Sequence, residues 1–142
     1  MTDVSPPQGP TGAAADAIVE RDNLAGVEGD RRGGLRKDIS NAMVGIKKQL
    51  YGKGPVKAKT YLNDNIVFCV LEGGLTRNEE TLLAAGEADL VRSYRLRFQE
   101  VVGATAREAV ERLTGRTVIG YHSQIVFEPD RAFEIFVLDR EP

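Results

Sequence analysis

Apolar residues recur along the chain with two periods, and the helical period appears first in GGLRKDISNAMVGIKKQLYG, residues 33–52. The apolar positions of this segment follow one another at steps of three or four: Leu35, Ile39, Met43, Ile46 and Leu50. Such spacing places them on one face of an α-helix. Gly52 and Pro55 then end the helix, because glycine accepts the left-handed conformation and proline cannot continue a helix.

The next segment alternates apolar and polar residues, which is the period of a β-strand. In VKAKTYL, residues 56–62, one face would carry Val56, Ala58, Thr60 and Leu62, and the other face Lys57, Lys59 and Tyr61. A turn over residues 63–65 follows, and then IVFCVLE, residues 66–72, is apolar on both faces. The pattern predicts a hairpin whose second strand lies inside the sheet.

Helical periodicity returns after a pair of glycines. Thr76 and Glu79 have the spacing of a capping box, which indicates that a helix begins there. A longer helix is predicted over residues 87–114, with Gly115 as its end. The apolar side of this helix is expected to contain Val91, Tyr94, Phe98, Val101 or Val102, Thr105, Ala109 and Leu113.

Two further strand-like segments complete the pattern, residues 117–127 and residues 132–139, with a turn between them. The last segment, AFEIFVLD, is again apolar on both faces, so it also belongs inside the sheet. We therefore expect an α+β fold with two layers and a four-stranded antiparallel sheet in the order 1-2-4-3. Its elements follow as helix, hairpin, one or two helices, hairpin, with an N-terminal helix and a long central helix covering one face.

Two further expectations follow from this arrangement. The residues before each hairpin resemble each other, 50–53 (LYGK) and 113–116 (LTGR), which indicates either a duplicated αββ unit or a chance similarity of helix-to-strand junctions. The uncovered face of the sheet would be partly apolar. An open apolar face on so small a domain favours a homo-oligomer, and a dimer is the simplest case.

Residues 1–32 differ from the remainder, and we expect one domain over residues 33–142. The first 31 residues hold three of the six prolines, no aromatic residue, and six acidic residues against two arginines. Such a composition buries too little apolar surface to offset the entropy lost on ordering. We predict a disordered acidic arm, although AAADAIVERDNL, residues 13–24, has the composition of a short helix that forms on docking.

Overall composition narrows the class of protein. The 142 residues carry a net charge of −2, without the basic excess of a nucleic-acid-binding protein. A single cysteine excludes an internal disulfide and fits a reducing cytoplasm. No apolar run approaches the roughly 18–20 residues that span a bilayer, and the first ten residues lack the features of a signal peptide. We expect a cytoplasmic protein without direct membrane insertion or a nucleic-acid partner.

The sequence GKGP, residues 52–55, resembles part of a phosphate-binding loop. A phosphate-binding loop follows a strand and opens a helix. Here a helix comes before the glycines and a strand after them, so a helix end is the simpler interpretation. A hairpin would nevertheless bring this loop beside the next pair of glycines. That proximity leaves a candidate small-anion site, formed by Lys53, Gly54, Gly73, Gly74, Thr76 and Arg77.

Other candidate residues lack the neighbouring residues that metal binding or nucleophilic catalysis requires. His122 has no second ligand near it in sequence, Cys69 lies in the most apolar strand, and Ser123 lacks a glycine elbow. We therefore expect no metal site, no cofactor and no enzymatic activity. Arginines alternate with glutamates on the long helix, which is typical of a solvated face or of a docking surface. The candidate docking residues are Arg92 and Arg95 of that helix, with Lys57, Lys59 and Tyr61 of the first strand.

The segments YGKGPVKAKTYLNDNIVFCVLEGGLTRNEETLL, VRSYRLRF and LTGRTVIGYHSQIVFEPDRAFEIFVLD together resemble the MpsC-like family. The resemblance covers residues 33–139 and rests on the GKGP junction, the helix start LT-x-x-E and the final strand FVLD. It implies a small soluble protein that accompanies membrane subunits of a sodium-translocating, membrane-potential-generating system, with a link to ion movement and inorganic-carbon supply. The family brings no established catalytic residues to this chain.

Two functions remain open at this point. The first is a non-enzymatic accessory or regulatory protein, a homo-oligomer that docks a partner such as a transporter on its cytoplasmic side. The second is a sensor that binds a small anion or a nucleotide phosphate at the two glycine loops, residues 53–54 and 73–76.

Overall fold

The computed structural model describes the backbone of residues 12–142 and the side chains of residues 28–142. The chain divides into two compact units, Met1–Gly34 and Leu35–Pro142. Helix α1 (Gly12–Tyr51) contributes residues to both units.

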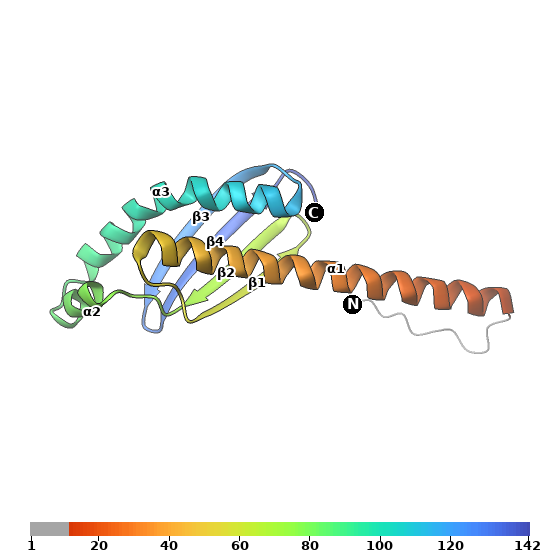
Figure 1. The fold of residues 1–142 in the computed structure, drawn as a ribbon, viewed down its shortest axis with the longest axis horizontal. Coiled ribbons are helices and arrows are strands. Elements are labelled where there is room, and N and C mark those ends of the chain that lie inside the picture. Colours follow the sequence, from red (N-terminus) through yellow and green to blue (C-terminus); the bar gives the residue numbers. More distant parts are fainter. Residues whose placement is uncertain (1–11) are drawn as a thin grey trace. The chain divides into compact units, whose positions relative to one another are not determined.

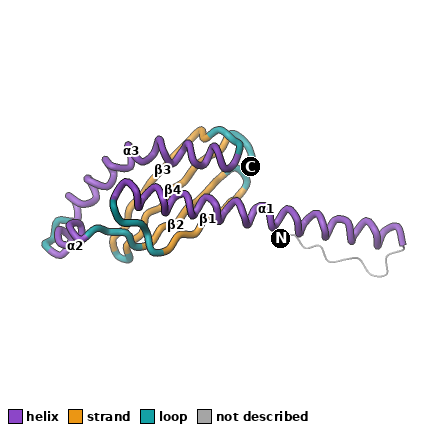
Figure 2. Tube along the Cα trace, in the orientation of Figure 1, coloured by secondary structure: helices purple, strands orange, loops and turns teal. Residues whose placement is uncertain are grey.

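The second unit contains a four-stranded antiparallel sheet and helices on one of its faces (Figure 1). The remaining elements are β1 (Lys57–Asn63), β2 (Ile66–Glu72), α2 (Arg77–Ala84), α3 (Ala88–Thr114), β3 (Val118–Phe127) and β4 (Asp130–Leu138). The sheet order is β1-β2-β4-β3, and each neighbouring pair is antiparallel. The α+β class, the order of elements and the strand order expected from the sequence are all confirmed (Figure 2).

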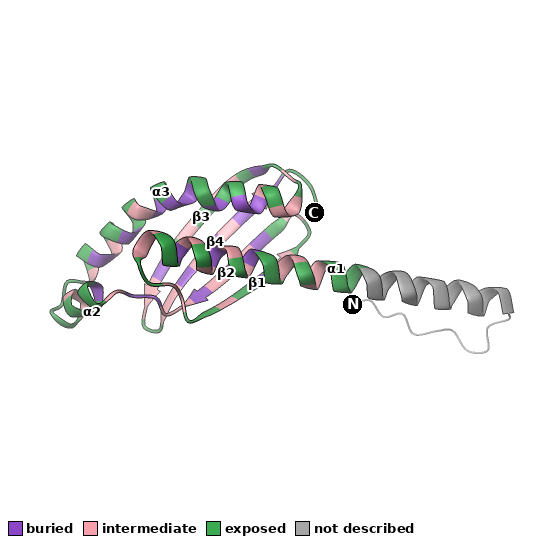
Figure 3. Cartoon of the chain, viewed as in Figure 1, coloured by how far each residue is buried: buried purple, intermediate pink, exposed green. Residues whose placement is uncertain are grey.

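The core lies between the sheet and the two long helices, α3 and the part of α1 that begins at Leu35 (Figure 3). Alternation along the two inner strands directs one set of side chains toward the helices. The fully buried members of the core include Ile39, Met43, Val67, Cys69, Leu71, Val110, Phe136 and Leu138. Cys69 is therefore a core residue, as predicted.

The helix ends follow the signals in the sequence. Gly52 follows α1 with a φ of 81°, and its N–H bonds to the carbonyl of Lys48 at 3.0 Å. Thr76 and Glu79 form both halves of the capping box that begins α2. Gly115 ends α3 in the left-handed conformation.

Three details differ from expectation. From Gly12 onward the predicted disordered arm is helical, while residues 1–11 of that arm lie outside the described residues. No proline interrupts residues 12–51, and Arg31 pairs with Glu28 three residues earlier, which favours a helix. Val56 was expected on the buried face of the first strand, but it lies outside β1 and is 81% exposed, although its N–H bonds to the carbonyl of Glu72 at 2.9 Å.

The third difference concerns the buried face of α3. Tyr94 and Thr105 are exposed, although the apolar period placed them inside, whereas Arg95 and Gln99 are buried. Of the two alternatives Val101 and Val102, Val102 is the buried one. The buried stripe therefore contains polar side chains at helical spacing. Carboxylates on other elements accept hydrogen bonds from these two side chains, Glu79 from Arg95 and Glu134 from the amide nitrogen of Gln99.

Candidate functional site

The helix-covered face of the sheet carries a buried carboxylate at its centre. Glu134 belongs to the inner strand β4, and none of its surface is exposed. Its oxygens accept hydrogen bonds from Lys47 of α1 (3.4 Å), Gln99 of α3 (2.8 Å), and Ser123 (2.9 Å) and Tyr121 of β3. We call these five residues the Glu134 network. It joins both long helices to the sheet through one side chain.

Strand register and helical spacing place the donors. Ser123 is the direct cross-strand partner of Glu134, so both side chains lie on the same face. Tyr121 precedes Ser123 by two residues and shares that face. Lys47 follows Met43 by four residues, which turns it toward the sheet with the apolar side of α1.

Charge and burial set the protonation of this network. Burial lowers the pKa of Lys47, and the nearby carboxylate of Glu134 opposes part of that shift. Burial also raises the pKa of Tyr121, and Glu134 adds to the rise, so the hydroxyl stays protonated and donates. An isolated carboxylate would be costly at this depth, and the four donors provide its compensation.

A second buried cluster lies where α2 begins. Arg95 of α3 donates from Nε and Nη2 to the two carboxylate oxygens of Glu79, each at 2.6 Å. Its Nη2 also donates to the carbonyl of Gly74 at 3.0 Å, and its guanidinium lies 4.4 Å from the ring centre of Tyr51. Burial alone would raise the pKa of Glu79, but its bonds with Arg95 and Thr76 together lower it.

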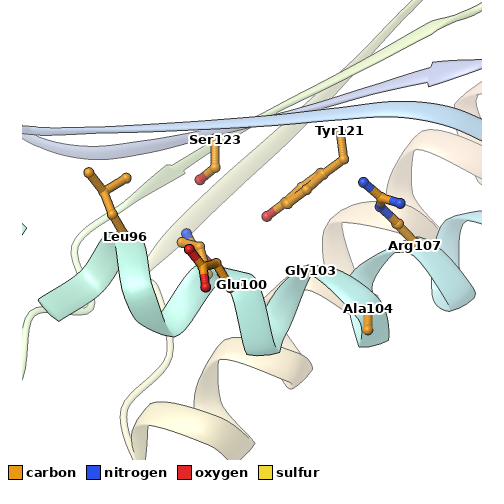
Figure 4. A pocket seen from close by; sticks show the side chains of 8 residues that line it. Leu96, Glu100, Gly103, Ala104, Arg107, Tyr121 and Ser123 are labelled. Atoms are coloured by element: carbon orange, nitrogen blue, oxygen red, sulfur yellow. The ribbon is translucent and has the colours of Figure 1, made fainter. Parts of the chain in front are cut away.

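A cavity of about 540 Å³ adjoins the Glu134 network, between α3 and the edge strand β3 (Figure 4). Tyr121 and Ser123 point into it from β3, and Arg107 reaches toward it from α3. The remaining lining residues are Leu96, Gln99, Glu100, Gly103 and Ala104. A volume of this size is within the range of small-molecule sites.

The predicted anion site assembles in part. Its two glycine loops do meet, because a Cβ on Gly74 would lie 3.2 Å from the backbone nitrogen of Pro55 and 3.4 Å from the carbonyl carbon of Gly54. The hollow between the loops, however, holds only about 10 Å³, which is about the space of one water molecule. Lys53 and Arg77, the charged members of the predicted site, are exposed.

Internal carboxylates already occupy the amides that an anion would need. The N–H and hydroxyl of Thr76 both donate to Glu79, at 2.9 Å and 3.0 Å. The carboxylate of Asp130 accepts a hydrogen bond from the backbone of Leu75, and burial raises the pKa of Asp130. Anion binding at these loops stays a prediction, and the geometry of Thr76 favours its role as a helix cap.

The predicted docking residues separate into two groups. Arg95 was expected at a docking surface, but its side chain is only 7% exposed and is held by Glu79, so that expectation is wrong. Arg92 stays partly exposed beside Asp89, at 3.7 Å. The residues of β1 in this set, Lys57, Lys59 and Tyr61, are exposed on the uncovered face of the sheet.

Aromatic side chains form a row across that uncovered face, which we call the aromatic row. Tyr61, Phe68 and Phe133 come from three adjacent strands, with ring centres 6.2 Å and 5.8 Å apart. A surface hollow of about 530 Å³ lies over the same face and is lined by residues of β1, β2 and β4. Charged side chains border it: Lys57, Lys59, Glu72 and Arg131.

Sequence reasoning missed the Glu134 network entirely. A glutamate in the middle of AFEIFVLD, on the face of an inner strand that turns toward the helices, was the available signal. His122 lies exposed on β3. The hydroxyl of Ser123 donates a hydrogen bond to the carboxylate of Glu134, not to a histidine. Within the part of the chain that the structure describes, no group of three His, Cys, Asp or Glu residues is arranged to hold a metal ion.

Comparison with known proteins places the chain in a family. A family described as the Na⁺-translocating membrane potential-generating system (MpsC) matches residues 31–140. The chain belongs to the MpsC family. A relative in Bacillus subtilis (strain 168), described as uncharacterized protein YrhF, is 29% identical over 98 residues, which cover 68% of this chain and 80% of the relative. No solved structure matches the chain.

The MpsC match includes every residue of the two buried clusters and of the aromatic row. Among the described residues, no helix is long and apolar enough to cross a membrane. The resemblance noted from the sequence is thus confirmed at the level of the family.

Proposed function

We propose that this protein is a non-enzymatic accessory component that binds membrane subunits of a Na⁺-translocating system from the cytoplasm. The observation that carries the proposal is the match to the MpsC family over residues 31–140, since the family is described by such a system. In this role the chain would bind an ion or inorganic-carbon transport system and regulate it.

The aromatic row supplies the binding surface in this proposal. Tyr61 is 46% exposed, and aromatic side chains are enriched at protein interfaces because they bury large areas. The border of the row has an excess of positive charge, because Lys57 and Arg131 share one carboxylate, that of Glu72, at 3.9 Å and 3.8 Å. Such a surface fits an apolar partner surface with an acidic border.

A second copy of the chain would present the same basic border. Like charges facing each other disfavour that arrangement, so charge favours a different protein as the occupant of the aromatic row. The homo-oligomer expected from the open face stays a prediction. Light scattering of the purified chain tests it separately from binding to the membrane subunits.

The test of the proposal uses vesicles that contain the membrane subunits of the cognate Na⁺ system. Binding of the purified chain is measured by flotation, and the sodium-dependent membrane potential by a voltage-sensitive dye. We expect the wild-type chain to bind and to change the potential, and Tyr61→Lys to bind at least tenfold more weakly. Val101→Lys is the matched control, because Val101 is 63% exposed on α3, in the helical layer.

The outcomes separate the alternatives. Equal binding of Tyr61→Lys and Val101→Lys would reject the aromatic row as the docking surface. An absence of wild-type binding would reject the accessory role with these subunits. A mass that falls to that of the monomer in Tyr61→Lys alone would assign the row to a second copy of the chain.

A further inference from the structure

We propose that the cavity between α3 and β3 binds a small organic zwitterion, with a carboxylate at the Arg107 end and an ammonium group at the Gln99 end. This inference is independent of the proposed function, since it uses the helix-covered side of the sheet. The cavity is the one shown in Figure 4, with a volume of about 540 Å³.

Small residues on α3 create the space. Gly103 and Ala104 both line the cavity, and Gly103 faces the ring of Tyr121. A Cβ on Gly103 would lie 3.0 Å from Cε2 of Tyr121, which is closer than ordinary van der Waals contact. Glycine at this position therefore lets the helix approach the strand while the volume beside it stays open.

The inner end of the cavity offers hydrogen-bond acceptors. Gln99 lines the cavity and is 4% exposed. Its amide nitrogen donates to Glu134, while its Oε1 is buried and accepts no hydrogen bond from any described residue. Ser123 and Tyr121 each donate their hydroxyl proton to Glu134, so their remaining lone pairs accept. The carboxylate of Glu100 lies at the same end. A ligand group that donates several hydrogen bonds, such as an ammonium group, would pair with the acceptors at this end of the cavity.

The other end offers a cation. The guanidinium of Arg107 lies 5.7 Å from the ring centre of Tyr121, and among the described residues it forms no salt bridge. Guanidinium groups bind carboxylates through two parallel hydrogen bonds. Arg107 follows Gln99 by eight residues of α3, a rise of about 12 Å along the helix axis. An elongated ligand is therefore needed to reach both ends.

Charge balance favours a zwitterion over a simple anion or cation. The side chains around the cavity and behind it carry two negative charges, Glu100 and Glu134, and two positive charges, Lys47 and Arg107. A ligand without net charge preserves this balance, whereas a simple anion or cation leaves one charge without a counterpart. The ammonium group of such a ligand then lies at the Gln99 end, near Glu100. Its carboxylate lies at the other end, near Arg107.

The test compares two sets of probes, one that varies in length and one that lacks an end group. Glycine, 4-aminobutyrate and 6-aminohexanoate vary the length between ammonium and carboxylate, while hexanoate and hexylamine each lack one end. Binding to the full chain is followed by calorimetry and by the amide shift of Gly103 in nuclear magnetic resonance spectra. We expect one of the longer amino acids to bind at least tenfold more tightly than hexanoate and hexylamine.

Two variants locate the site. Arg107→Ala removes the exposed cation and should weaken the best probe at least tenfold, and Ala104→Leu should block it by filling the cavity. Arg112→Ala is the matched control, because Arg112 is an exposed arginine of the same helix that does not line the cavity. Far-ultraviolet circular dichroism checks that each variant is folded.

Either of two results would overturn the proposal. The first is that no amino acid binds better than the probes with one end. The second is that Arg107→Ala and Arg112→Ala bind the best probe equally well while both are folded.

Discussion

Arg95 of α3 holds Glu79 of α2 through two parallel hydrogen bonds, each 2.6 Å long, in the interior of the protein. Glu79 is also the residue whose carboxylate caps its own helix at Thr76. One carboxylate therefore fixes the start of α2 and the position of α2 against α3. Burial of such a pair is favourable only while both partners are present.

Removal of Arg95 alone should destabilise the protein strongly. Arg95→Met leaves the Glu79 carboxylate buried without its cation, and we expect the free energy of unfolding to fall by roughly 3–5 kcal/mol. Urea denaturation measures the change. The double variant Arg95→Met, Glu79→Gln should recover part of the loss, because the unpaired charge is gone.

Arg97→Ala serves as the control for that experiment. Arg97 is exposed on the same helix, and surface substitutions change stability by less than about 0.5 kcal/mol. A loss of stability in Arg95→Met no larger than in Arg97→Ala would show that the pair contributes little.

The same pair predicts a dependence of stability on pH. The folded-state pKa of Glu79 is lowered from its ordinary value of 4.5, so the folded state binds its proton less readily than the unfolded chain. The stabilisation is therefore complete above about pH 4.5 and is lost as the pH falls through the lower folded-state pKa.

Urea denaturation across the acid range measures this loss. We expect the double variant Arg95→Met, Glu79→Gln to lose less stability on acidification than the wild type, because the titrating carboxylate is absent. Parallel acid profiles for the two proteins would contradict the prediction. Asp130 titrates with the opposite sign, since burial raises its pKa, and Arg95 and Glu79 act on that pKa in opposite directions.

Glu134 is expected to be as sensitive as Arg95. Glu134→Ala removes the acceptor of four side chains and leaves the buried charge of Lys47 unpaired, so a loss of roughly 3–5 kcal/mol is expected. The double variant Glu134→Leu, Lys47→Met replaces the pair by apolar groups and should be more stable than Glu134→Ala. If the double variant were less stable than the single variant, the unpaired charge would not be the cause.

The fold was predictable from the sequence because apolar periodicity reports which face is buried. β2 and β4 carry apolar residues on both faces, with Glu134 as the exception in the middle of β4. Only inner strands need that pattern, so the order β1-β2-β4-β3 followed. The helix ends followed from Gly52, Thr76 and Gly115, whose conformations are local properties. Each of these signals depends on neighbours in sequence alone.

The candidate site was not predictable in the same way, because its residues satisfy one another across elements. Arg95 and Gln99 continue the buried stripe of α3 at steps of four from Val91, but polar residues are ordinarily assigned to the surface. Their burial is favourable only because Glu79 and Glu134 lie opposite. Such pairings come from the tertiary arrangement, which no periodicity contains.

Two glycines with similar φ values, Gly74 and Gly86, distinguish the cost of backbone strain from the cost of close packing. Gly74 and Gly86 have φ values of 93° and 83°, so alanine is strained by roughly 1–2 kcal/mol at either position. A Cβ at Gly86 meets nothing within 4 Å, whereas at Gly74 it would press on the backbone of Pro55. Gly74→Ala should therefore lower the melting temperature more than Gly86→Ala, and equal losses would contradict the close contact of the two loops.

Cys69 should be unreactive toward thiol reagents while the protein is folded. Its surface is fully buried, and burial raises the pKa of the thiol from 9.0 to about 11. A shift of that size lowers the thiolate fraction about 100-fold near neutral pH, since each pKa unit is a factor of ten. A colorimetric disulfide reagent should therefore label the native protein at least 100-fold more slowly than the urea-unfolded chain. Labelling at the rate of glutathione without denaturant would show that β2 opens readily, and it would contradict the packing of Cys69 between the sheet and the helices.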